Sequence, residues 1–201
     1  MISIPQKIID NFTDIHFQID ICKEAYTNTI LSGSSTYPTI VFYKNFDYPY
    51  LTVISPKGPS YEDTMSNVTT ALHLYSPLKA CGCYVVLDSF YTIDNQTHNA
   101  INIFLMSEIN AFSIILPYVK VEEDNSIIWL DDKCFISSID DQELDEIGKT
   151  IVSSFYLFVN SQNILFTVQE IMSYMSKVGH QILFHDSSDE IKYLKISDKV
   201  E

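Results

Sequence analysis

The chain has 201 residues, enough for one large domain, and hydrophobic residues make up 46% of it, so a full core can form. All 12 basic residues are lysines and none is arginine, against 26 acidic residues, which gives a formal net charge of −14. Arginine makes the forked contacts that hold phosphate, and an acidic surface repels polyanions. We therefore expect no direct nucleic acid binding and an attraction to basic partners.

The first predicted element is a helix over about residues 5–31. Ser3 can cap it, and Ser32-Gly33-Ser34 can end it. Its apolar residues recur at spacings of three and four and form one stripe: Ile8, Phe12, Ile15, Ile19, Cys22, Tyr26 and Ile30. Two strands, 39–44 and 50–55, follow, and the short link between them predicts a hairpin.

A second helix is predicted to start at Ser60, whose hydroxyl can cap it while Asp63 reaches back to the cap residue. Pro77 is expected to stop this helix, because proline cannot continue one. The apolar stripe that should face the core is Tyr61, Met65, Val68, Leu72 and Tyr75.

The second half of the chain predicts strands first and then helices. Strands are predicted at 84–93, 100–107, 111–121 and 127–130, and their short links require antiparallel pairing. Helices are predicted over about 140–178 in two pieces, the second ending at Gly179, and a C-terminal hairpin over about 180–197. This order predicts one α+β domain, 1–201, with a mostly antiparallel sheet and about four helices on one side of it.

The sequence shows no basic, apolar and small-residue succession typical of a secretory signal. The most apolar stretches, 109–121 and 151–159, are too short to cross a bilayer. We therefore expect a cytoplasmic protein that makes no membrane contact, with its four cysteines reduced.

Motifs for catalysis and metal binding are weak. The pair Cys81-Gly82-Cys83 is closer than zinc sites usually space their cysteines and has no second pair, so two small residues at a turn is the favoured interpretation. His180 and His185 fall on opposite faces of a strand. Nucleophile elbows and glycine-rich phosphate loops are missing from the sequence, and we expect no cofactor and no metal site.

Acidic residues concentrate in the window 122–146, which holds ten of the 26 acids and only Lys133 as a base. The window can be a solvated face whose acids complement a helix dipole, a docking surface for a basic partner, or a cation site unlike the EF-hand loop. The candidate partner-binding residues are Glu122, Glu123, Asp124, Asp131, Asp132, Asp140, Asp141 and Glu143.

These patterns favour a non-enzymatic acidic binding protein that docks on a basic protein partner and blocks it. Immunity proteins against basic toxins and viral inhibitors of nucleic-acid enzymes use this charge logic, in which acids steer association. Two alternatives stay open. One is a structural subunit, which could be a homo-oligomer, with an exposed apolar patch. The other is an enzyme whose site combines distant residues, with Asp88, Glu108 and the Cys81/Cys83 turn as first candidates.

Overall fold

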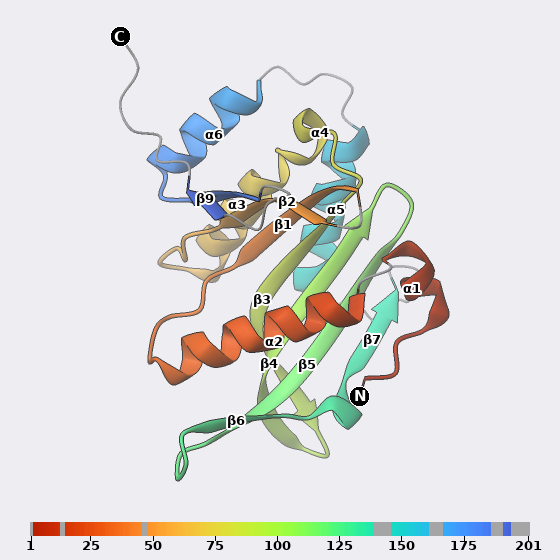
Figure 1. Cartoon of the computed structure of the whole chain (residues 1–201), viewed down its shortest axis with the longest axis vertical. Coiled ribbons are helices and arrows are strands. Elements are labelled where there is room, and N and C mark those ends of the chain that lie inside the picture. The colour runs from red at the N-terminus through yellow and green to blue at the C-terminus, as the bar shows by residue number, and fades with distance from the viewer. Residues whose placement is uncertain are drawn as a thin grey trace.

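The computed structural model describes residues 2–12, 15–45, 48–138, 146–160, 167–185 and 191–193. The chain has an α+β fold built on a single antiparallel sheet, which confirms the predicted class (Figure 1). The strands are β1 Thr39–Asn45, β2 Tyr48–Ile54, β3 Gly82–Ile93, β4 Gln96–Ser107, β5 Ala111–Val121, β6 Ser126–Trp129, β7 Phe135–Ser138, β8 Gln181–His185 and β9 Ile191–Tyr193. The helices are α1 Gln6–Asn11, α2 Ile15–Leu31, α3 Tyr61–Leu72, α4 Tyr75–Leu78, α5 Glu146–Asn160 and α6 Val168–Lys177, with a 3₁₀ turn, η1, at Asp131–Lys133.

The strand order in the sheet is β6-β5-β4-β3-β1-β2-β8-β9. The outer edge of β5 is shared by two short strands, because β6 pairs with residues 118–121 and β7 with residues 112–115. Sequence reasoning missed β7, which has four residues, two of them serine. The predicted hairpins at β1–β2 and β8–β9 are present.

Helices cover both faces of the sheet, so the expectation of helices on one side was wrong. One buried cluster joins α3, α4, α5 and α6 to side chains such as Val85 and Leu87 of β3. A second cluster joins α1 and α2 to Tyr84 and Val86 of the same strand. Because successive strand residues point to opposite faces, the first half of β3, which is buried at every position, must be covered on both.

The predicted N-terminal helix is two helices, with a break at Phe12. The backbone of Phe12 leaves the helical region at φ −140° and ψ 79°, and its carbonyl accepts a hydrogen bond from the Ile15 amide at 3.1 Å. The Phe12 ring packs in the core against Tyr84 and Phe112, with centroids at 5.9 Å and 6.3 Å. The break therefore turns the chain while the stripe Ile8, Phe12, Ile15 and Ile19 stays buried.

Helix α3 begins where its sequence predicts. The Ser60 hydroxyl accepts from the Asp63 amide at 3.1 Å, and the Asp63 carboxylate accepts from the Ser60 amide at 3.2 Å. The helix ends at Leu72, before Pro77, which lies inside the short helix α4. Tyr61 was expected to face the core, but its side chain is 50% exposed because it is the first residue of the helix.

The central strands reach beyond the helices that cover one face. Helices α3 to α6 gather at the end of the sheet opposite the β5–β6 hairpin (Figure 1). The first six residues of β3 are buried, and the last six alternate between exposed and half-buried. The far ends of β3, β4, β5 and β6 therefore form an open extension of the sheet.

Candidate docking surface

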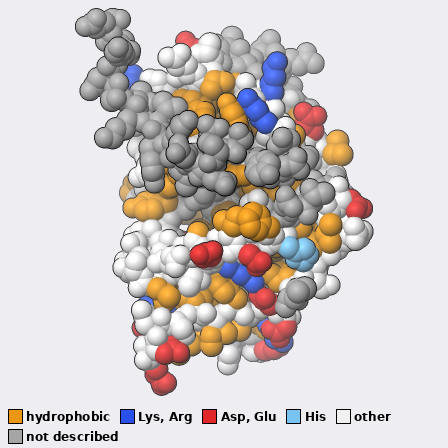
Figure 2. Space-filling view, viewed as in Figure 1, with side chains coloured by type: hydrophobic (Ala, Val, Ile, Leu, Met, Phe, Trp, Pro, Cys, Tyr) orange, Lys and Arg blue, Asp and Glu red, His pale blue; other side chains and the backbone are white. Residues whose placement is uncertain are grey.

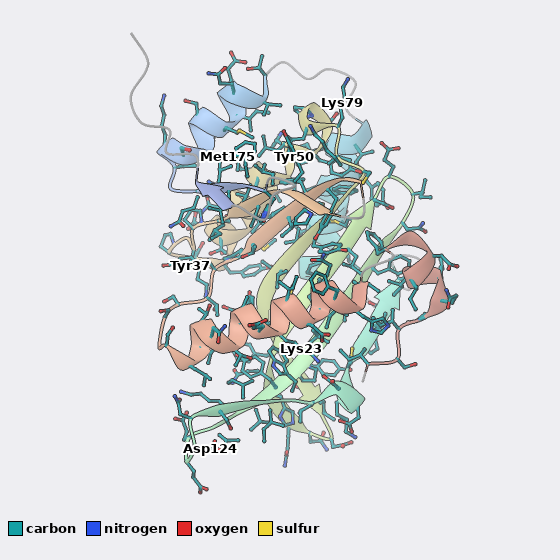
Figure 3. All side chains as sticks on the ribbon, in the orientation of Figure 1. Lys23, Tyr37, Tyr50, Lys79, Asp124 and Met175 are labelled. Carbon is teal, nitrogen blue, oxygen red and sulfur yellow. The ribbon has the colours of Figure 1, made fainter. Side chains whose placement is uncertain are left out.

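Three of the candidate acids occupy the turn between β5 and β6. Glu122, Glu123 and Asp124 are all exposed, and Asp124 lies at the far end of the molecule from Met175 and Lys79 (Figure 3). Lys120 approaches Glu122 at 3.3 Å, and the Ser126 hydroxyl donates to Asp124 at 2.6 Å. The turn thus presents carboxylates to solvent on a projecting hairpin.

Two further candidates, Asp131 and Asp132, lie in η1. The Lys23 ammonium of α2 donates to the Asp131 carboxylate and lies 5.8 Å from the centroid of the Trp129 ring. The Lys23 side chain is only 13% exposed, whereas that of Asp132 is 78% exposed. Asp131 therefore helps to fasten α2 to the edge of the sheet, and Asp132 faces solvent.

The candidate acids that the structure describes, 122–124 and 131–132, do not form one patch. Asp124 and Asp131 flank the four-residue strand β6, and four strand residues span about 13 Å. The remaining candidates, Asp140, Asp141 and Glu143, lie outside the described residues. The partner-binding role of the eight candidates stays a prediction.

The fold adds Asp94 to the acids of the β5–β6 turn. Asp94 and Asn95 form a two-residue turn between β3 and β4, with φ of 49° and 65°, and Asp94 is exposed. The pairing of Asn99 with Tyr118 brings this turn level with the β5–β6 turn. The sequence predicted a short link after the strand 84–93, which begins with Asp94, but did not join this residue to the other acids. Aligning the β3–β4 and β5–β6 hairpins through the pairing of β4 with β5 could have shown that the two turns lie at the same level. We call Asp94, Glu122, Glu123 and Asp124 the acidic rim.

The paired cysteines point away from each other across the sheet. The thiol of Cys83 is fully buried in the cluster beneath α3 to α6, and burial raises its pKa well above the usual value. Cys81 packs against the cluster on the α1–α2 face. The two sulfurs therefore do not converge on a shared site.

The two C-terminal histidines are also separate. His180 is 4% exposed, and its ring nitrogens lie 3.2 Å from the Met175 carbonyl and 3.0 Å from the Asn67 carbonyl. His185 contacts the Thr52 hydroxyl at 2.7 Å. Each histidine thus has its own polar partners.

The possible acid–base pair Asp88 and Glu108 is not brought together. Asp88 accepts from Thr36 and from Lys57, the latter at 2.7 Å. Glu108 follows Ser107, which pairs with Gly82, six residues along β3 from Asp88, a separation of about 20 Å. These carboxylates cannot act on one bond from these positions.

Within the described ranges, no group of three or more His, Cys, Asp or Glu side chains is arranged to hold a metal ion. No helix among the described residues is both long and apolar enough to cross a membrane. Comparison with protein-family models, curated proteins and solved structures finds no match to the chain.

Proposed function

We propose that the chain is a non-enzymatic acidic binding protein that docks on a basic protein partner and blocks it. The observation that carries this proposal is the acidic rim, four exposed carboxylates from two neighbouring turns. The segments that form this end of the sheet, 89–101 and 117–130, contain these four acids and Lys120 as their one lysine.

Carboxylates concentrated on projecting turns give a local negative potential on a chain that already carries a charge of −14. Such a potential raises the association rate of a basic partner and repels acidic competitors. Figure 2 shows acidic side chains at the end of the molecule that carries the β5–β6 hairpin. Blocking would follow from occupying the partner's basic surface.

The test compares two variants that lose the same charge. The rim variant is D94N/E122Q/E123Q/D124N, and the matched control, D10N/D20N/E24Q/E108Q, removes four exposed acids from other elements. Tagged wild-type protein first captures a basic protein from lysate. Association rates of the captured protein with all three forms are then measured from low to high salt, together with inhibition of its own activity.

We expect the rim variant to associate about tenfold more slowly at low salt and to show a flatter salt dependence, because steering depends on local charge. The control should change the rate much less. Equal slowing by both variants would mean that net charge alone attracts the partner. Binding without loss of the partner's activity would contradict the blocking role.

A further inference from the structure

The open extension of the sheet carries a row of two aliphatic, one tyrosine and one histidine side chain on the face that α3 to α6 cover elsewhere. Tyr91 of β3 pairs with His98 of β4, and Val119 of β5 pairs with Ile128 of β6. The pairing of Asn99 with Tyr118 brings His98 level with Val119. The four side chains therefore cross four neighbouring strands in one line, and we call them the sheet row.

The sheet row lies on the same face as Val85 and Leu87, because Tyr91 follows them at even spacing on β3. Those two residues are buried under helices, whereas Ile128 is 52% exposed and Val119 is 36% exposed. Tyr91 and His98 are half-buried, and the Tyr91 ring stacks on Phe135 at 5.9 Å. On this face the helices α3 to α6 lie toward the opposite end of the sheet (Figure 1), whereas α2 contacts β6 on the other face.

The charges around the sheet row select the kind of partner. The row itself has no acidic or lysine side chain, and the acidic rim begins three residues beyond Tyr91 and Val119 on their own strands, about 10 Å away. An apolar row bordered by carboxylates is complementary to an apolar strip bordered by lysine or arginine. A second copy of this chain would bring another charge of −14 to the contact, which disfavours self-association.

We propose that the sheet row is the contact face for the basic partner, which meets it with apolar side chains flanked by basic ones. This inference rests on the proposed function and extends it. The acidic rim sets the rate at which the partner approaches, and burial of Val119 and Ile128 sets how long it stays.

Two peptides of equal length and charge serve as probes: an amphipathic Lys/Leu peptide and a Lys/Ser peptide. The row variant is V119T/I128T, which keeps the β-branched shape and makes both side chains polar. The control variant is F17Q/I21Q, which removes two apolar residues, 63% and 43% exposed, from the outer surface of α2. Binding is measured by fluorescence anisotropy, and contacts by hydrogen exchange over 89–100 and 117–129.

We expect the wild-type protein to bind the Lys/Leu peptide about tenfold more tightly than the Lys/Ser peptide, from the apolar area buried at the row. The row variant should lose most of that preference, and the control variant should keep it. Protection from exchange should appear in both segments of the wild-type protein. Circular dichroism and unchanged melting temperatures would show that the variants fold.

Three results would overturn the inference. Equal loss of preference in the two variants, or no preference in the wild-type protein, would remove the sheet row from binding while leaving rim-dependent attraction of both peptides intact. Self-association of the wild-type protein that V119T/I128T abolishes would make a second copy the occupant. Failure of the rim variant to weaken binding of either peptide would instead contradict the proposed function.

Discussion

At the scale of single residues, the histidines show how burial sorts one residue type into different roles. His180 joins three parts of the fold, because its Nε2 also lies within reach of the Ser55 hydroxyl, at 3.2 Å. His73 packs its ring on Phe158 with centroids 3.7 Å apart, and His185 lies against β2. Burial lowers the pKa of both His73 and His185 below 6.5.

These two histidines predict a loss of stability in mild acid. In the unfolded chain both imidazoles return to a pKa near 6.5, so as the pH falls the unfolded state takes up protons before the folded state does. Their contribution to stability is therefore intact above pH 6.5 and decreases as the pH falls from there toward the lowered pKa values. We expect H73N/H185N to lose less stability than the wild-type protein between pH 7.5 and pH 5.5, measured by urea unfolding.

Comparing how steeply the stability of the two proteins falls with pH controls for other titrating groups, because both proteins contain the same carboxylates. A constant offset between the two stability curves would only report the packing that the imidazole rings provide. Parallel curves across this range would show that neither histidine changes its proton affinity on folding.

At the scale of elements, the capping boxes of α3 and α6 explain where these helices begin. In α6 the Thr167 hydroxyl accepts from the Glu170 amide at 3.2 Å, and the Glu170 carboxylate accepts from the Thr167 amide at 2.7 Å. The hydrogen bonds that the Glu170 carboxylate accepts from the Thr167 amide and hydroxyl lower the pKa of Glu170. Amides that would otherwise lack a partner at the first turn are satisfied by neighbouring side chains.

We expect S60A to destabilise the protein by about 1 kcal/mol, because it removes the acceptor for the Asp63 amide. The matched change S66A, at an exposed position inside the same helix, should be neutral or slightly stabilising, since alanine has the higher helix propensity. Denaturant unfolding of both variants measures the difference. Equal effects would mean that the cap contributes nothing beyond propensity.

Helices and strands could be predicted from the sequence where the spacing of neighbouring residues decides them. Their positions relative to one another in the fold could not be predicted. The capping pair Ser60 and Asp63 and the turn at Gly179, with φ of 96°, are local signals that the structure bears out. The break at Phe12 depends on the rings of Tyr84 and Phe112, which come from strands far along the chain and which no helical periodicity contains. Which face each helix covers depends on the same distant pairings.

At the scale of the whole molecule, excess negative charge opposes folding. A charge of −14 on a compact chain repels itself, and salt screens that repulsion by shortening the Debye length from about 30 Å at 0.01 M to about 8 Å at 0.15 M. We expect the melting temperature to rise by about 2–4 °C over this range, which corresponds to about 1 kcal/mol for a protein of this size. Calorimetry or circular dichroism measures it.

The rim variant should show a smaller rise, because it removes four of the repelling charges. A melting temperature that falls with salt would mean that ion pairs such as Lys57 with Asp88 outweigh the repulsion.

The candidate surface could be predicted from sequence only in part. Acids that are neighbours along the chain were found, but the extended β6 separates Asp124 from Asp131, and pairing of β4 with β5 adds Asp94. The sheet row could not be predicted either. Its residues look like ordinary alternating strand positions, and only the extent of α3 to α6 shows that they are left uncovered.

The position of β2 has a consequence for synthesis. Its outer edge pairs with β8, and the contact of Thr52 with His185 joins residues 133 positions apart. At ribosomal speeds of about 5–20 residues per second, that segment takes on the order of ten seconds to emerge. During this interval β2, with Leu51 and Val53 destined for the core, has an unpaired edge of the kind that recruits other chains. Nascent chains on one messenger RNA are therefore most prone to associate with one another before β8 and β9 are synthesised.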